Sequence, residues 1–250
     1  DTNISSIATG AIADYSTFAN NGTLGGGTAG FAPIWNESGQ VGGAYTFDGV
    51  DDYIDFGDIT AVEAVPEISF GAWINPSDYG PGVTLFDLRT IFTKGELNGD
   101  NTNVFWSHFQ GDGSQNLFYC GVDSTTNFYS AIIPATNFSI GQWTFFACTW
   151  KSGEGVKLYV NGTLIFTTYP ESGVTIDTAH TVKLGKSDNP TDDLFNGSID
   201  EAFLMPRKLS AQQIQQMYLD GYAGHNPETF VSQELDAADI WSTCVTPNDA

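Results

Sequence analysis

The stretch Y-T-F-D-G-V-D-D-Y-I-D-F-G, residues 45–57, carries the strongest local structural signal in the sequence. Its two ends, Y-T-F and Y-I-D-F, alternate between apolar and polar residues and flank an Asp-Gly pair. This pattern predicts a β-hairpin, because glycine accepts the positive φ that a tight turn needs. The turn also gathers Asp48, Asp51 and Asp52. Three carboxylates this close repel each other, so they either point into water or surround a cation.

The composition favours an all-β protein with an acidic surface. The chain has 250 residues, 41% of them apolar and 14% aromatic, with 28 glycines, which suits one large β domain or two small ones. Eight basic and 30 acidic residues give a net charge of −22. Such a surface repels nucleic acid and anionic membranes, so we exclude both as partners.

No apolar run is long enough to span a bilayer. The chain begins at Asp1 without a signal peptide, and we interpret it as a mature or excised segment.

The cysteines and sequons are compatible with an exported protein. Cys120 and Cys148 fall in expected strands and are either bridged or simply buried, and the odd count leaves one thiol without a partner in its own chain. Zinc is not expected, because there is no C-x-x-C pattern. Six N-x-S/T sequons are possible glycosylation sites and give weak support for an extracellular location: Asn3, Asn21, Asn36, Asn137, Asn161 and Asn196.

Taken in order, the chain begins with a Gly-rich leader, residues 1–30, which shows no alternation. Short strands separated by turn residues follow, which predicts an antiparallel sandwich or jelly roll. Asn161-Gly162 predicts a second tight hairpin. One short α-helix is expected near residues 210–220, where Ser210 and Gln213 have the spacing of a capping box and Gly221 is placed to end the helix. It is expected to cover the sandwich as a lid.

Residues 222–250 follow that helix as a separate, strand-like extension. Its apolar positions are Phe230, Val231, Ile240, Trp241 and Val245.

Several motifs, in order, resemble the laminin-G-like family of the concanavalin A-like lectin/glucanase fold. They are F-D-G-V-D-D-Y-I-D-F-G, I-S-F-G-A-W-I-N-P, A-C-T-W, K-L-Y-V-N-G-T-L, L-F-N-G-S-I-D-E-A-F-L and L-S-A-Q-Q-I-Q-Q-M-Y. Together they cover roughly residues 20–220. The resemblance implies a two-sheet jelly roll, usually extracellular, often adhesive, architectural or carbohydrate-binding, and often stabilised by calcium.

Two departures from that family suggest strand complementation. The resemblance implies an opening strand that Asp1 to Thr9 do not match, and its absence would expose an edge near residues 199–201. The tail W-S-T-C-V-T-P-N-D-A resembles the closing strand of an immunoglobulin-like repeat. The tail therefore fills the gap in its own chain, fills it in the next subunit to build a head-to-tail filament, or is a linker.

The turn aspartates make calcium the expected cofactor, because calcium takes six to eight oxygen ligands. The resemblance adds Asp200 to Asp48, Asp51 and Asp52. The alternative is a turn whose carboxylates accept hydrogen bonds from its own backbone. A second acidic loop with Asp188, Asn189, Asp192 and Asp193 is expected to be merely solvated.

Catalysis is not expected. The glucanase strand motif alternates three carboxylates, but Ser198 replaces its nucleophile and Phe203 its acid. There is no H-E-x-x-H, no G-x-S-x-G and no phosphate loop.

Glycan binding is the alternative function, because sugars stack on exposed aromatic rings. Trp106 and Tyr129 are the candidates, with Trp35 and Tyr79 near other expected loops. Each ring singly is better explained as core packing.

We therefore predict one laminin-G-like β-sandwich over residues 31–221 that is not an enzyme. It is expected at the cell surface or outside the cell, with calcium, in a structural or adhesive role. The expected partners are further copies of itself or other surface proteins, with glycans as the alternative.

Overall fold

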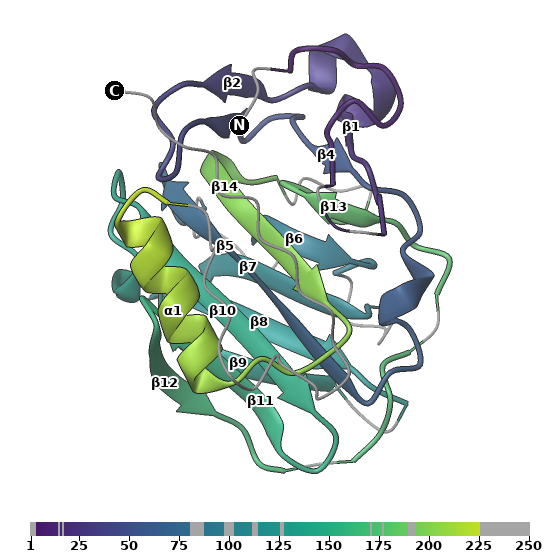
Figure 1. Cartoon of the computed structure of the whole chain (residues 1–250), viewed down its shortest axis with the longest axis vertical. Coiled ribbons are helices and arrows are strands. Elements are labelled where there is room, and N and C mark those ends of the chain that lie inside the picture. Colours follow the sequence, from purple (N-terminus) through teal and green to yellow (C-terminus); the bar gives the residue numbers. More distant parts are fainter. Residues whose placement is uncertain are drawn as a thin grey trace, which may run out of the picture.

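A computed structural model describes residues 4–14, 16, 18–80, 88–97, 103–111, 115–125, 128–170, 172–176, 178–189 and 194–225. Within these ranges the chain forms two seven-stranded antiparallel sheets and one α-helix (Figure 1). The sheets pack as a jelly-roll sandwich, which confirms the predicted all-β class. Several predicted residues lie outside the described ranges: Asn3, Asp192, Asp193, Phe230, Val231, Ile240, Trp241, Cys244 and Val245.

Each strand pairs with the neighbour that follows it in these lists. The first sheet has the order β1 (Thr23–Leu24), β4 (Ile54–Asp55), β13 (Val182–Leu184), β6 (Leu88–Lys94), β7 (Phe105–Gly111), β8 (Asn116–Asp123), β9 (Phe128–Pro134). The second sheet has the order β12 (Thr163–Thr167), β11 (Gly155–Val160), β10 (Thr144–Lys151), β5 (Glu67–Pro76), β14 (Asn196–Met205), β3 (Ala44–Asp48), β2 (Ile34–Asn36). Short 3₁₀ turns are η1 (Gly25–Gly27), η2 (Ala29–Phe31), η3 (Thr60–Val62) and η4 (Ala135–Asn137).

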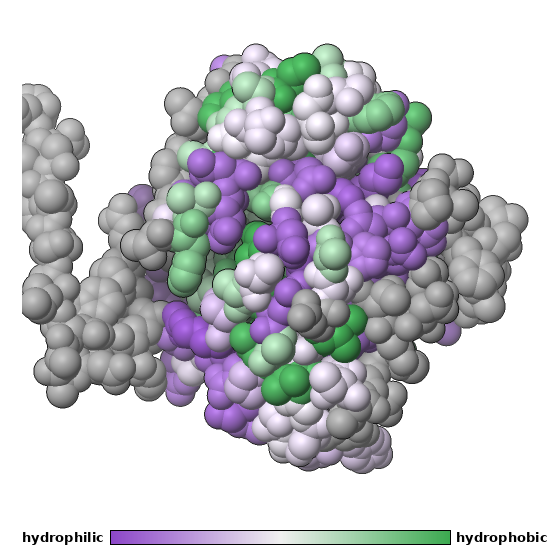
Figure 2. All heavy atoms as spheres, turned by 90° about the vertical axis from the view of Figure 1, so that its right-hand side faces the viewer, coloured by the Kyte–Doolittle hydropathy of each residue, from purple (hydrophilic) through white to green (hydrophobic). Residues whose placement is uncertain are grey.

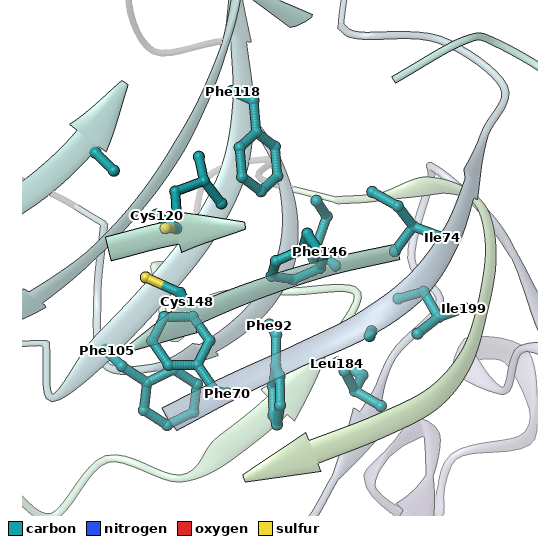
Figure 3. Packing of buried hydrophobic residues seen from close by; sticks show 14 of the residues in the cluster. Phe70, Ile74, Phe92, Phe105, Phe118, Cys120, Phe146, Cys148, Leu184 and Ile199 are labelled. Atoms are coloured by element: carbon teal, nitrogen blue, oxygen red, sulfur yellow. The ribbon is translucent and has the colours of Figure 1, made fainter. Parts of the chain in front are cut away.

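The core between the sheets is mainly aromatic. Phe70 of β5 contacts Phe105 of β7 across the sandwich, with ring centroids 4.6 Å apart. Phe118 of β8 contacts Phe146 of β10 in an edge-to-face arrangement at 5.3 Å. All four side chains are fully buried, and Figure 3 shows them converging from both sheets. Aromatic burial on this scale supplies most of the driving force for holding the two sheets together.

The expected hairpin at residues 45–57 is not formed. β3 pairs with β14 in the second sheet, whereas β4 pairs with β13 in the first. Residues 49–53 therefore cross from one sheet to the other. The Asp-Gly pair does mark a turn, and Gly49 has a φ of 75°. A turn signal does not specify which strand each arm pairs with. Here the buried Phe47 and Ile54 enter one core from opposite sheets.

The second expected hairpin is confirmed. β11 and β12 are antiparallel neighbours joined by Asn161-Gly162. Their φ values of 48° and 73° are both positive, as a type I′ turn requires. The Gly-rich leader also contributes β1 and its two 3₁₀ turns, which the lack of alternation did not predict.

Helix α1 (Ala211–Tyr222) covers the outer face of the second sheet (Figure 1). The expected capping box is confirmed, because Ser210 accepts the Gln213 N–H and Gln213 Oε1 accepts the Ser210 N–H. Gly221 does not end the helix as expected. A Cβ at Gly221 would lie 2.3 Å from the Trp73 indole nitrogen, so this glycine lets the helix approach β5.

One face of the molecule is largely polar. Figure 2 shows a hydrophilic band across the face on the right of Figure 1, with smaller apolar patches above and below it. Among the described residues, no helix has both the length and the hydropathy needed to cross a bilayer.

Lys94 is a buried cation at the end of β6. Its side chain has no exposed surface, and its Nζ lies 2.8 Å from Glu63 and 2.6 Å from the carbonyl oxygen of His180. Asp58 is its second carboxylate partner. These contacts join β6 to the segment that follows β4, which contains Asp58 and Glu63, and to the segment that precedes β13, which contains His180. Each carboxylate offsets the cost of burying the ammonium group.

Replacing Lys94 with methionine should lower the free energy of unfolding by about 3–5 kcal/mol, because Glu63 would stay buried without its cation. Lys157→Met is the matched control, since Lys157 makes a more exposed ion pair with Glu154 and should cost below about 1 kcal/mol. Urea unfolding of both variants would measure the difference. Equal costs would contradict the assigned role of Lys94.

Candidate metal centre

The segment that crosses between the sheets has a fixed shape. It begins beside β14, where Asp48 is paired with Asn196. A Cβ at Gly49 would come within 2.7 Å of the Asn196 Cβ, so only glycine fits this approach. The Asn196 amide in turn donates to Asp78 Oδ2 at 2.6 Å, and Arg89 Nε donates to Asp78 Oδ1 at 2.7 Å. The crossing segment thus packs against a side chain that is itself held in place.

The structure brings Asp48, Asp51 and Asp52 together. Each of them offers a carboxylate oxygen, and these oxygens all lie within 4.8 Å of one another. Backbone groups hold the arrangement: the Asp48 N–H donates to Asp52 Oδ2 at 2.9 Å, and the Val50 N–H donates to Asp48 Oδ1 at 2.8 Å. The carboxylates are therefore clustered by the fold of the segment itself.

The cluster carries unbalanced negative charge. Asp52 is only 6% exposed, and burial raises the pKa of its carboxyl group. The hydrogen bond from the Asp48 N–H lowers this pKa, whereas the charges of Asp48 and Asp51 raise it further. None of the ion pairs formed among the described residues involves these three aspartates. A hard divalent cation would remove this repulsion, and clustered carboxylate oxygens are the ligands that calcium prefers.

Asp200 is not part of the cluster. It lies four residues beyond Asn196 on β14, about 13 Å along the strand. Its carboxylate accepts the Val41 N–H and the Glu201 N–H, each at 2.8 Å. Asp200 therefore fastens the segment between β2 and β3 to β14. The β14 residue beside the crossing segment is Asn196, which is paired with Asp48.

Glu201 is a residue whose role the sequence did not reveal. It occupies a β-bulge between β14 and β5, with a φ of 45°. Burial, with a further contribution from the neighbouring Asp200 charge, raises its pKa to about 7. Adjacent acidic residues in a strand usually project to opposite faces, so the partial burial of Glu201 beside the buried Asp200 could not be predicted from their spacing.

Asp188, in the second acidic loop, is not merely solvated as expected. Asp188 Oδ2 accepts the Thr181 N–H at 3.1 Å and lies 2.9 Å from His180 Nδ1. Asp188 also forms an ion pair with Lys183. Its carboxylate is thus occupied by partners from the same region of the chain.

Neither glycan candidate presents a free ring. Tyr129 is 5% exposed and belongs to the core between the sheets. Trp106 is 7% exposed and lies over Gly121, where a Cβ would come within 2.3 Å of the indole ring. The structure places both residues in strands, β9 and β7, and not in loops.

The sequons differ in accessibility. Asn196 is half-buried, and its amide nitrogen is engaged by Asp78. Four others are exposed: Asn21, Asn36, Asn137 and Asn161.

Comparison with known proteins agrees with the fold and the motif order. A laminin-G model of the concanavalin A-like lectin/glucanases superfamily matches residues 48–215. The chain belongs to this superfamily. The matched range begins at Asp48 and includes the whole segment that crosses between the sheets.

Similarities to individual proteins are more distant. The human adhesion G-protein coupled receptor D1 is 34% identical over 113 residues, which are 43% of this chain and 12% of the receptor. Domain 4 of AbnA, an arabinanase from Geobacillus stearothermophilus, aligns with 21% identity and a TM-score of 0.53 over 75% of this chain and 81% of that domain. The binding domain of botulinum neurotoxin serotype G aligns with 18% identity and a TM-score of 0.61 over 86% of this chain and 49% of that domain. At these identities the two structures show a shared fold only.

Glu201 predicts a specific pH dependence of stability. Because its pKa is raised from 4.5 to about 7 in the folded protein, the fold favours the protonated form. The contribution of protonated Glu201 to the free energy of unfolding is fully present below pH 4.5, and it is lost as the pH rises towards 7. Glu201→Gln should therefore gain stability relative to the wild type over this range.

Chemical denaturation at several pH values between 4 and 8 would measure that gain. Glu37→Gln is the matched control for the removal of one acidic side chain, because Glu37 is exposed. A stability difference for Glu201→Gln that stays constant between pH 4 and 8 would refute the assignment.

Proposed function

We propose that this chain is a non-enzymatic adhesion module that acts outside the cell and is stabilised by a calcium ion bound at Asp48, Asp51 and Asp52. The observation that carries the proposal is the clustering of three carboxylates in the segment that joins the two sheets. A calcium ion there would fix the crossing and relieve the charge around the buried Asp52. Carbonyl oxygens of the segment and water would complete its coordination.

The adhesive role is supported by the superfamily and by similarity to a segment of an adhesion receptor. The absence of catalysis is supported by the surroundings of the acidic residues on β14. Asp200 is 7% exposed and accepts two backbone N–H groups, so it is committed to holding structure. A glycosidase needs two carboxyl groups facing a cleft that admits substrate and water.

Glycan binding has weaker support. One structure of similar fold, domain 4 of AbnA, was obtained with arabinotriose. In this chain, however, Trp106 and Tyr129 are both buried, which removes the rings that the sequence suggested for stacking.

Assembly with further copies is the form of adhesion that we favour. The edge expected near residues 199–201 is not open, because Ile199 on β14 is paired with Tyr45 on β3 and with Ile74 on β5. β12 is the last strand of the second sheet and pairs, among the described strands, with β11 alone. Three successive apolar side chains on it are exposed by 38–47%: Leu164, Ile165 and Phe166. Unpaired, apolar edge strands readily accept a strand from another chain. The strand-like sequence of residues 230–245 would supply that strand, and repetition would give a head-to-tail filament.

Calcium should raise the melting temperature of the wild type. At calcium concentrations about 100-fold above Kd, the expected rise over the EDTA-treated protein is about 5–10 °C. Asp52→Asn should abolish this rise. In EDTA the same variant should melt at or above the wild-type temperature, because it removes a buried charge that lacks a cation.

Asp188→Asn is the control for this experiment. It should lower the melting temperature by a similar amount with and without calcium, because Asp188 is paired with Lys183 and His180. Differential scanning calorimetry would follow all three proteins. A calcium-dependent rise that persists in Asp52→Asn would exclude the proposed site.

Assembly should depend on both the tail and the edge strand. Sedimentation of the full chain should show a concentration-dependent series of multimers. Removal of residues 226–250, or Ile165→Lys on β12, should leave monomers. Tyr169→Lys is the matched control, because Tyr169 is 88% exposed but lies beyond the end of β12. A full chain that sediments as a monomer at all concentrations would contradict the proposal.

A further inference from the structure

Two thiols face each other in the centre of the sandwich. Cys120 lies on β8 of the first sheet and Cys148 on β10 of the second, and neither has any exposed surface. Both are free thiols that belong to one core cluster. Figure 3 shows their sulfur atoms turned toward one another across the space between the sheets.

The strand pattern explains why they meet. On β8 the side chains of Phe118 and Cys120 both point into the core, as do those of Phe146 and Cys148 on β10. The rings of Phe118 and Phe146 are in contact, with centroids 5.3 Å apart. Each cysteine lies two residues after its phenylalanine, so both thiols lie on the core faces of their strands, next to the ring contact.

The two sheets approach each other along β8 and β10. β8 and β10 include residues whose Cα atoms lie within 8 Å of each other. Facing sheets are commonly about 10 Å apart, whereas a disulfide needs Cα atoms about 4.4–6.8 Å apart. The neighbours of Cys120 on the adjacent strands are Ser107 and Ala131, which are fully buried and small. They leave room for the small further approach that a bridge requires.

We propose that Cys120 and Cys148 form a disulfide that joins the two sheets through the core. The oxidant is a protein or small-molecule disulfide of an oxidising compartment. One cysteine thiolate attacks it and releases a thiol, and the second cysteine then displaces the remaining thiol from the mixed disulfide. Two protons and two electrons leave the cysteine pair, and the oxidant is reduced to two thiols.

Burial determines when the bridge forms. In the reduced folded state, burial raises the pKa of the Cys148 thiol well above its usual value, and the neighbouring Cys120 raises it further. A buried, protonated thiol exchanges slowly with disulfides in solution. The bridge therefore forms while the sheets are still closing, and it is then protected from reductants. This inference does not depend on the proposed calcium site or on assembly.

Peptide mapping would detect the bridge directly. The chain would be refolded in a buffer of reduced and oxidised glutathione, then denatured and alkylated with N-ethylmaleimide without added reductant. The expected result is a linked pair of peptides containing Cys120 and Cys148, with alkylation only at Cys244. Alkylation of both Cys120 and Cys148, or a bridge from either to Cys244, would overturn the proposal.

Thermal stability gives an independent measurement. Unfolding in the presence of dithiothreitol should lower the melting temperature of the oxidised wild type by about 5–10 °C, because the bridge constrains the unfolded chain. A variant with both Cys120→Ala and Cys148→Ala should be insensitive to the reductant. Cys244→Ala should remain as sensitive as the wild type. Insensitivity of the wild type, or of Cys244→Ala, would overturn the assignment of the bridge.

Discussion

The fold depends on the burial of aromatic side chains between two sheets whose described strands pair only within their own sheet. Apolar contact is nondirectional, so contacts such as Phe70 with Phe105 hold the sheets together without fixing every detail of their register. Segments that cross between the sheets supply further constraints. The segment from Asp48 to Tyr53 is one of these, and it crosses where β3 ends beside β14. Its conformation therefore affects both sheets at once.

Local patterns predicted the local structure of this chain well. The Asn161-Gly162 turn and the Ser210 capping box are confirmed, because each depends on residues adjacent in sequence. The short strands expected after the leader correspond to the strands of the two sheets. The predicted hairpin at 45–57 is wrong because pairing is decided at long range. β3 finds its partner in β14, about 150 residues later in the chain.

The candidate site likewise combines a feature set by local sequence with one set by long-range pairing. The clustering of Asp48, Asp51 and Asp52 was predictable, because their spacing keeps them in one short segment. The position of Asp200 was not, since it depends on how far β3 runs along β14 before the two strands part. Gly221 is a similar case. A glycine near a helix end usually signals termination, but here the approach of Trp73 decides its role.

The acidic composition gives the aspartate cluster its significance. A chain with a net charge of −22 is destabilised by self-repulsion when it becomes compact, and buried carboxylates add most to that cost. Around Glu63 and Asp58 the protein supplies its own cation, because Lys94 reaches both from β6. Around Asp52 the described residues supply no such cation, although burial and charge repulsion are combined there. A metal ion would do at this cluster what a lysine does at the other, with one added property. Its occupancy follows the calcium concentration of the surroundings, so the rigidity of the crossing segment would follow it too.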